Sequence, residues 1–252
     1  MLELKNKNIL ITGASSGIGL ELAKKFASVN CNLALLARRK EVIDQQVKNF
    51  INSQAKILSV KCDVSKKDEV KSAIKEFKNT FGKVDVAILN SGISIPQKII
   101  NFKSDVAKEI FDINVIGLFN FAEELIPEMI ANKNGWIVGI SSLADGRGFP
   151  QNGAYCASKA AASIFLESLR IELKRYNIKV ITVKPGFVRT PMTDKNSFKM
   201  PFLINVEKAA EIIINGMKNE KRIIQFPLPT SIGAKILKII PNFLFELISK
   251  SY

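Results

Sequence analysis

The sequence contains no histidine, so the side chain that most often acts as a general base in enzymes is absent. Three cysteines are an odd number without metal-ligand spacing, which favours reduced thiols and no bound metal. No uninterrupted apolar run approaches the roughly 20 residues that a transmembrane helix needs, and the first residues lack the apolar stretch of a signal peptide. We therefore expect a cytoplasmic protein without a metal, a disulfide or a membrane span.

What is present indicates a globular protein with a substantial core. The chain has 252 residues, of which 47% are apolar, and this length is common for a single α/β domain. The formal net charge of +14 allows a nucleic acid or an anionic membrane as a partner. No nucleic-acid-binding motif accompanies this charge, so a lysine-rich surface together with an anionic cofactor is the preferred explanation, and no nucleic acid is expected.

Short apolar runs alternate with helical patterns along the chain. The expected strands are Asn8–Thr12, Cys31–Ala37, Lys56–Cys62, Val84–Leu89, Gly135–Ile140, Lys179–Val183 and Arg222–Phe226. The expected helices are Leu20–Ser28, Val42–Ser53, Lys67–Phe81, one or two over Ser104–Ile130, one from Tyr155 to Arg175, and Glu207–Lys218. This alternation predicts an α/β fold with a doubly wound parallel sheet of about seven strands and helices on both faces. Ligands bind such sheets beyond the carboxyl ends of the strands.

A glycine-rich turn follows the first strand directly and opens the first helix. Gly13 permits the tight turn, Gly17 lets the backbone approach a pyrophosphate, and Gly19 permits close packing of helix on strand. The free N–H groups of the helix terminus suit phosphates. The spacing is Gly-x-x-x-Gly-x-Gly, and it predicts a dinucleotide site, with an ordinary glycine-rich turn as the alternative.

The second strand ends in Arg38-Arg39-Lys40, where an acidic residue would favour NAD. A guanidinium at this place suits a 2′-phosphate, so NADP(H) is expected in preference to NAD(H). The alternative is a solvated basic cluster at the start of the next helix. Asp63, after the third strand, is interpreted either as an acceptor for the adenine amino group or as a cap for the following helix.

Three further polar motifs stand near strand ends or inside an apolar helical pattern. Asn90-Ser91-Gly92 closes the fourth strand, where small residues let a ligand lie against the backbone. Asn114 lies inside an apolar helical pattern, where its amide must find partners, and a structural polar network explains it as well as a functional role. Ser142 follows the fifth strand, again at the carboxyl edge.

Tyr155 and Lys159 are four residues apart on a predicted helix and therefore share one face. A nearby ammonium favours the phenolate, so this spacing predicts a lowered phenol pKa and a group that exchanges protons. A tyrosine and a lysine at this spacing usually just share a helix face and have no catalytic role. The rest of the chain favours a functional meaning, because no histidine is present and only this tyrosine has a lysine four residues on.

In combination these motifs resemble the short-chain dehydrogenase/reductase family over about residues 5–228. The resemblance depends on Thr12–Gly19, Asp63, Asn90-Ser91-Gly92, Asn114, Ser142, Tyr155-Cys156-Ala157-Ser158-Lys159 and Pro185-Gly186. Ser91 departs from the pattern, in which alanine is usual. The resemblance implies a Rossmann-type fold and hydride transfer between NAD(P) and a small-molecule alcohol or carbonyl.

The resemblance also implies a role for each matching residue. Ser142 would hydrogen-bond the substrate oxygen, Tyr155 would protonate it, Lys159 would lower the phenol pKa and bind the nicotinamide ribose, and Asn114 would hold a water. The cofactor would meet Gly13, Ser15, Ser16, Gly17, Ile18, Arg38, Arg39, Asp63, Val64, Asn90, Ser91, Gly92, Tyr155, Lys159, Pro185, Gly186, Val188 and Thr190. A scaffold that binds NADPH and regulates a partner without catalysis is the alternative function.

The catalytic domain is expected over residues 1–228, with a substrate loop at about 191–206 and an apolar extension over 229–252. Lysines and a proline interrupt the extension. It is interpreted as packing on a partner subunit or the substrate pocket, as touching the inner face of a membrane peripherally, or as a core helix. By family analogy we expect a homodimer or homotetramer and a substrate that is hydrophobic or lipid-like.

Overall fold

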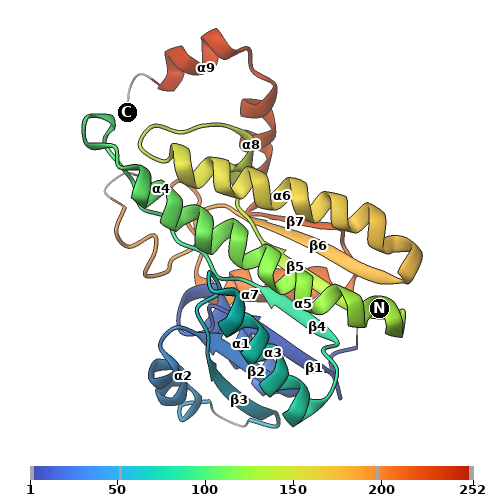
Figure 1. The fold of residues 1–252 in the computed structure, drawn as a ribbon. Coiled ribbons are helices and arrows are strands. Elements are labelled where there is room, and N and C mark those ends of the chain that lie inside the picture. The colour runs from blue at the N-terminus through green and yellow to red at the C-terminus, as the bar shows by residue number, and fades with distance from the viewer. Residues whose placement is uncertain (1–2, 51–52, 197–198, 250–252) are drawn as a thin grey trace.

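A computed structural model describes residues 3–50, 53–196 and 199–249, and its centre is one parallel sheet (Figure 1). Seven strands pair in the order β3-β2-β1-β4-β5-β6-β7, and every pairing is parallel. The predicted doubly wound sheet of seven strands is thus confirmed. The strands are β1 (Asn8–Thr12), β2 (Asn32–Ala37), β3 (Lys56–Lys61), β4 (Val86–Leu89), β5 (Gly135–Ile140), β6 (Ile178–Pro185) and β7 (Ile223–Phe226).

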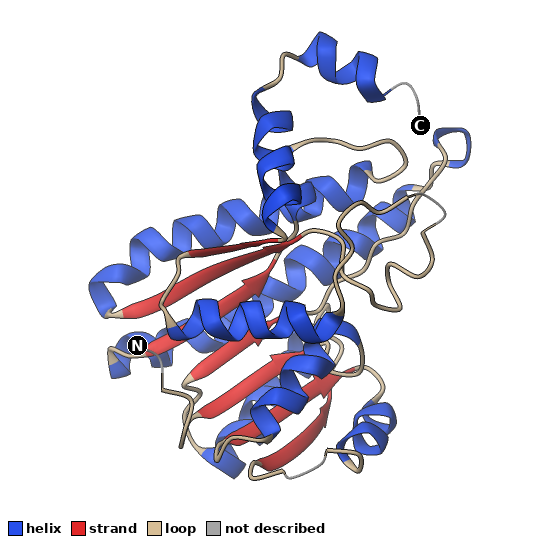
Figure 2. Ribbon diagram, turned by 180° about the vertical axis from the view of Figure 1, so that it is seen from behind, coloured by secondary structure: helices blue, strands red, loops and turns tan. Residues whose placement is uncertain are grey.

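Helices cover both faces of the sheet and form a separate apolar core on each (Figures 1 and 2). One core joins the strands to α1 (Gly17–Ala27), α2 (Lys40–Val47) and α7 (Val206–Lys218). The other joins them to α3 (Lys67–Phe81), α5 (Gly117–Asn132) and α6 (Gly153–Leu173). All four residues of β4 are buried, because a strand covered on both faces reads as one continuous apolar run.

The strand order reverses at β1, which pairs with β2 on one side and β4 on the other. The connections from the two sides of this point go to opposite faces, which leaves a crevice beyond the carboxyl ends of β1 and β4. The glycine-rich turn follows β1, and Asn90-Ser91-Gly92 follows β4. The topology therefore brings these two motifs together.

Two predicted helices differ from those observed. The helix expected over 42–53 is α2, which begins earlier and ends at Val47; residues 51–52 lie outside the described residues. The stretch 104–130 is not a continuous α-helix: α4 (Ser104–Phe111) is joined to α5 by five residues of π-helix, Asp112–Ile116. A π-helical turn widens the helix by one residue and often marks a functional site. Periodicity does not reveal it, because both flanking helices keep their apolar face.

After β7 the apolar extension forms α8 (Leu228–Ile239) and α9 (Asn242–Ser249), while residues 250–252 lie outside the described residues. The loop expected at 191–206 is closed at its base, where Val188 pairs with Ile204; its residues 197–198 also lie outside the described part. No helix in the described parts of the chain combines the length and apolarity needed to cross a bilayer. All three cysteines are buried and free.

Candidate active site

The glycine-rich turn is held in shape by the end of β4. Gly13 and Gly17 have φ values of 64° and 56°, in the left-handed region that favours glycine. The Asn90 side-chain amide donates to the carbonyl oxygens of Thr12 and Gly13, at 3.0 and 3.2 Å. The Thr12 hydroxyl oxygen accepts from the backbone N–H groups of Asn90 and Ser91, at 2.9 and 3.0 Å. Asn90 therefore positions the turn. The sequence predicted only that the small residues at this strand end let a ligand lie against the backbone.

Gly19 is the tightest point of this arrangement and gives a direct test. A Cβ atom there would lie 2.4 Å from the Asn90 amide nitrogen and 2.5 Å from the Gly13 carbonyl oxygen. We expect Gly19→Ala to push the turn off β4 and to weaken dinucleotide binding by about 10-fold or more, a loss of about 1.4 kcal/mol. Isothermal titration with NADPH measures this. Gly153→Ala is the control, because a Cβ at Gly153 meets no atom within 4 Å; equal binding in both variants and the parent would contradict the assigned role.

A pocket of about 510 Å³ opens from the glycine turn along the carboxyl edge of the sheet. Ser142 and all eighteen residues named above for the cofactor line it, while Asn114 does not. Sequence reasoning missed several other lining residues. Ile93, Ser94, Ile95, Glu109 and Ser141 belong to this group, whereas Pro191, Met192, Thr193 and Lys195 lie within the substrate loop predicted at about 191–206. Their only sequence signal is that most follow a strand end directly, within the next ten residues.

Ser142, Tyr155 and Lys159 lie together on one wall of this pocket. Ser142 is the N-cap of a 3₁₀ turn, Leu143–Gly146, and its hydroxyl oxygen accepts from the Ala144 N–H at 3.1 Å. A hydrogen bond joins the hydroxyls of Ser142 and Tyr155. The Lys159 ammonium donates to the Ile140 carbonyl oxygen at 3.0 Å and lies 5.9 Å from the centroid of the Tyr155 ring. Tyr155 and Lys159 both belong to the helix α6, so their relative placement follows from the four-residue spacing.

The pKa of Tyr155 moves in the direction opposite to the one predicted. Burial is the largest cause and raises the phenol pKa, the hydrogen bond from Ser142 opposes this, and the nearby charge of Asp145 raises it further. Burial also lowers the pKa of Lys159 from 10.5 to about 8. The spacing argument considered only the cation and omitted the loss of hydration, which affects both groups in the same pocket wall. The phenol is therefore protonated at neutral pH.

Asn114 sits in the π-helical turn, behind Gly92, with both amide hydrogens and one acceptor position of its oxygen engaged. Its oxygen accepts from the Ile93 N–H at 2.8 Å, and its nitrogen donates to the Ile93 carbonyl at 3.0 Å and to the Ser158 hydroxyl at 2.9 Å. A Cβ at Gly92 would be 3.1 Å from the Lys159 ammonium and 3.2 Å from the Asn114 amide oxygen. Asn114 thus forms the polar network weighed above and also lies beside Lys159.

Basic and acidic residues mark the far end of the pocket. Arg38 and Arg39 are exposed directly after β2, and both line the pocket. Arg39 is also the N-cap of α2, so the basic cluster lines the pocket and lies at the start of the next helix. Lys40 instead pairs with Asp44 at 2.9 Å. One oxygen of Asp63 accepts from both the N–H and the hydroxyl of Ser65, at 3.1 and 2.7 Å. Asp63 therefore stabilises the turn before α3 and also lines the pocket.

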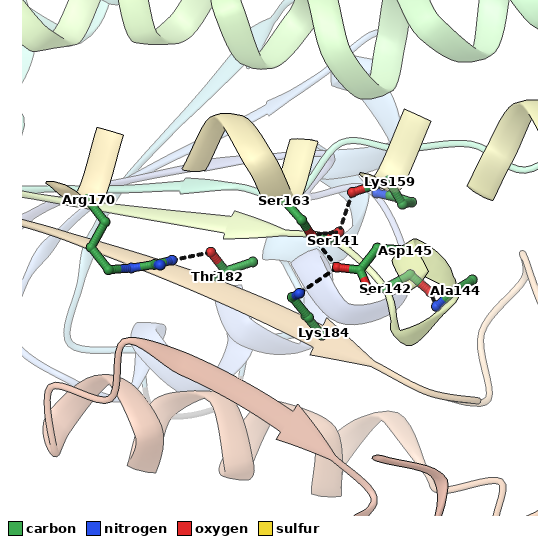
Figure 3. Close-up of polar contacts among 9 residues, drawn as sticks. All are labelled: Ser141, Ser142, Ala144, Asp145, Lys159, Ser163, Arg170, Thr182 and Lys184. Atoms are coloured by element: carbon green, nitrogen blue, oxygen red, sulfur yellow. Dashed lines mark hydrogen bonds and ion pairs between the residues drawn. The ribbon is translucent and has the colours of Figure 1, made fainter. Parts of the chain in front are cut away.

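A polar network that the sequence did not suggest connects the elements carrying these groups (Figure 3). Asp145 forms an ion pair with Lys184 of β6 at 2.6 Å and accepts from the Ser163 hydroxyl at 2.5 Å. The hydroxyl oxygens of Ser163 and Ser141 lie 2.8 Å apart, and the Ser141 hydroxyl is 3.0 Å from the Lys159 carbonyl oxygen. The network fixes the turn after Ser142 against α6 and β6. It could not be read from the sequence, because its members lie far apart in the chain.

Among the described residues, no group of three or more cysteine, aspartate or glutamate side chains is arranged to hold a metal ion. The pocket wall instead combines backbone N–H groups at the start of α1, two guanidinium groups and a serine–tyrosine–lysine cluster. Such a site can bind phosphates at one end and can exchange a proton with a bound oxygen at the other.

Comparison with known proteins agrees with this geometry. A family model described as short chain dehydrogenase matches residues 7–200. A protein of Myxococcus xanthus, described as an uncharacterized oxidoreductase, is 31% identical over 246 residues, covering 98% of this chain and 97% of its own.

Two solved structures share the fold at 22% sequence identity. A short chain dehydrogenase/reductase from Burkholderia phymatum, solved in complex with NAD, has a TM-score of 0.86 over 98% of this chain and 96% of its own. A short-chain dehydrogenase from Sphingobium yanoikuyae, solved in complex with NADPH, has a TM-score of 0.79 over 94% of this chain and 97% of its own. The two neighbours hold different dinucleotides, so the likeness itself does not distinguish NAD from NADP.

Proposed function

The chain belongs to the short-chain dehydrogenase/reductase family and is an oxidoreductase, and on this premise we propose that it reduces a carbonyl, or oxidises a secondary alcohol, with NADP(H). One observation carries the proposal. Ser142, Tyr155 and Lys159 converge on the wall of a pocket whose other end is the glycine-rich turn and two arginines. A proton donor and a phosphate-binding end in one pocket suit a reaction between a dinucleotide and an oxygen-bearing carbon.

The residues present fit a dinucleotide along the whole pocket. The glycine turn and the start of α1 offer N–H groups to the pyrophosphate. Asp63 and Val64 would flank the adenine, and Arg38 and Arg39 would suit the 2′-phosphate, since all four residues line the pocket. The nicotinamide end would be lined by Pro185, Gly186, Val188 and Thr190 together with Asn90, Ser91 and Gly92. When bound, this cofactor supplies or accepts the hydride.

The chain itself supplies the proton and holds the oxygen. In the reductive direction the Tyr155 hydroxyl gives its proton to the oxygen that gains charge, and the raised pKa keeps that proton in place until it is needed. Ser142 donates a hydrogen bond to the same oxygen, which is stabilisation of charge as it develops. The ammonium of Lys159 adds a positive charge close to the phenol and would hold the nicotinamide ribose.

Asn114 is proposed to hold the water through which Tyr155 and Lys159 recover a proton. A cavity of about 20 Å³ lies beside Asn114, Ser91 and Ile140. A volume of about 10–15 Å³ is enough for one water, provided that polar partners are near. The Ile140 carbonyl that accepts from Lys159 belongs to the same surroundings.

The preference for NADP(H) rests on Arg38. We expect Arg38→Asp to change the ratio of kcat/KM for NADPH to that for NADH by about 10-fold or more in favour of NADH, because the guanidinium is replaced by a carboxylate. Steady-state kinetics with both cofactors measures the ratio. Lys48→Asp makes the same change of charge at an exposed position outside the pocket and serves as the control. An equal ratio in parent and Arg38→Asp would remove Arg38 from the phosphate site.

A panel of aldehydes, ketones and secondary alcohols, with oxidation of NADPH or reduction of NADP⁺ followed optically, tests the activity itself. The apolar lining near Ile93, Ile95 and Met192 favours hydrophobic members of the panel. Binding of NADPH by calorimetry without turnover of any member would support the regulatory scaffold instead.

We also propose a cytoplasmic homo-oligomer. The three free, buried cysteines agree with a reducing compartment. Ile164 and Ile171 of α6 are 68% and 72% exposed, which suits burial against a second copy. Analytical ultracentrifugation distinguishes monomer, dimer and tetramer.

A further inference from the structure

The helix α8 places its apolar residues on an outward face. Leu228, Ile232, Ile236 and Ile239 recur at intervals of four, four and three residues, the spacing of one helix face. They are between 49% and 80% exposed. A helix that only completed the core would turn this stripe inward.

The helix α9 continues the exposed face while its other side is anchored. Phe243 and Leu247, four residues apart, are 69% and 65% exposed. Phe245 points the other way and is buried, with its ring centroid 6.0 Å from that of Phe149. The outward side chains are therefore presented by a helix that is packed on its inner side.

Arg147 fixes the two helices to the body of the protein. Its guanidinium donates to the carbonyl oxygens of Leu237, at 2.8 Å, and Ile240, and to the side chain of Asn242 at 2.7 Å. It also lies 4.9 Å from the ring centroid of Phe245. One side chain thus holds the end of α8, the connection and the start of α9. The exposed face is a preformed surface.

A second exposed apolar segment lies at the same end of the molecule. Both ribbon views place the turn Ile99–Asn101, just before α4, at the same end as α8 and α9 (Figures 1 and 2). Ile99 and Ile100 are each 84% exposed, and Phe102 follows them. We call the outward residues of α8, α9 and this turn the apolar tip.

The charges around the apolar tip are mostly positive, and the exposed Glu246 of α9 is the one acidic residue within α8 and α9. The sequence from Lys221 to Phe245 contains no aspartate or glutamate, and neither does the sequence from Asn90 to Lys103. Lys98, Lys103, Lys235 and Lys238 are exposed within these segments. An anionic lipid surface complements exposed apolar side chains that are accompanied by lysines. A second copy docked through a two-fold axis would set the same lysines against one another.

We propose that the apolar tip binds the interface of an anionic lipid bilayer, with α8 and α9 lying on the membrane and the turn at Ile99 beside them. The tip borders the candidate active site at two places. Ile95, four residues before Ile99, lines the pocket, and a Cβ at Gly186 would be 3.1 Å from the Thr230 side chain of α8. Binding by the tip brings the pocket close to the membrane. This interaction does not depend on the proposed reaction.

Flotation of the full chain with vesicles tests the proposal. One set of vesicles contains phosphatidylcholine alone, and the other contains phosphatidylcholine mixed with phosphatidylglycerol. We expect the parent to float with the anionic vesicles and less with the neutral ones, and to be released by salt. The double variant Phe243→Ser, Leu247→Ser should lower the ratio of bound to free protein by about 10-fold or more. Lys235→Gln with Lys238→Gln should reduce binding to anionic vesicles only.

Ile223→Ser is the control, because it removes an apolar side chain that is 46% exposed from β7, outside the tip. It should float like the parent. Thermal unfolding of each variant verifies folding, since the replaced side chains are exposed. A parent that stays unbound with both vesicle types would overturn the proposal, as would a double variant that binds like the parent. A change of oligomeric state in the double variant, without flotation of the parent, would identify the tip as a subunit interface instead.

Discussion

Replacing Tyr155 by phenylalanine is expected to lower kcat by about 10²–10⁴-fold and to leave the affinity for NADPH nearly unchanged. The substitution removes one hydroxyl from a pocket wall whose remaining groups, the glycine turn and the arginines, hold the dinucleotide. The loss falls on the proton transfer, because the sequence contains no histidine to replace the phenol. Steady-state kinetics with the best member of the carbonyl panel gives kcat, and titration calorimetry gives the affinity.

Tyr176→Phe is the matched control, because it removes the same atom from a tyrosine that lies outside the pocket beside Arg175. This variant should keep the parent's kcat. If Tyr155→Phe keeps kcat within about 10-fold of the parent, a phenol is not the proton donor, since general acid catalysis contributes at least about 10²-fold. A loss of NADPH binding equal to the loss of turnover would indicate a collapsed pocket instead.

The strand ends explain why much of the pocket could be predicted from sequence. Parallel strands bring their carboxyl ends to one edge, so residues that follow different strands meet without any contact being known. Gly13 after β1, Arg38 after β2, Asn90 after β4 and Ser142 after β5 all line one pocket for this reason. The Tyr155–Lys159 pair needed only the geometry of one helix.

What the sequence did not predict depends on contacts between distant residues or on hydration. The π-helical turn around Asn114 breaks no periodicity, and the ion pair of Asp145 with Lys184 joins a loop to β6. The pKa of Tyr155 was predicted in the wrong direction, because spacing gives the neighbouring charge and not the degree of burial. Arg147 has no sequence signal for its role, although it connects the tail to the turn after Ser142.

Lys159→Met is expected to lower kcat by about 10²-fold or more and, at the same time, to stabilise the fold at neutral pH. The pKa of Lys159 falls from 10.5 to about 8 on burial, which corresponds to a cost of about 3 kcal/mol for keeping the ammonium charged below pH 8. Methionine has a similar length and no charge. It leaves the Ile140 carbonyl without its donor, which costs about 1–2 kcal/mol. A net gain of about 1–2 kcal/mol in the free energy of unfolding remains.

The dependence on pH distinguishes this cause from improved packing. Between pH 8 and pH 10.5 the unfolded chain still binds a proton at residue 159 while the folded chain has released it, so this group makes stability rise with pH. The advantage of Lys159→Met should therefore be largest below pH 8 and disappear above pH 10.5. Urea unfolding at several pH values measures it.

Lys184→Met is the contrasting control, because it removes the partner of Asp145 at 2.6 Å and should destabilise the fold. A gain from Lys159→Met that stays constant with pH would mean that the ammonium carries no burial cost, and the stabilisation would then come from packing alone.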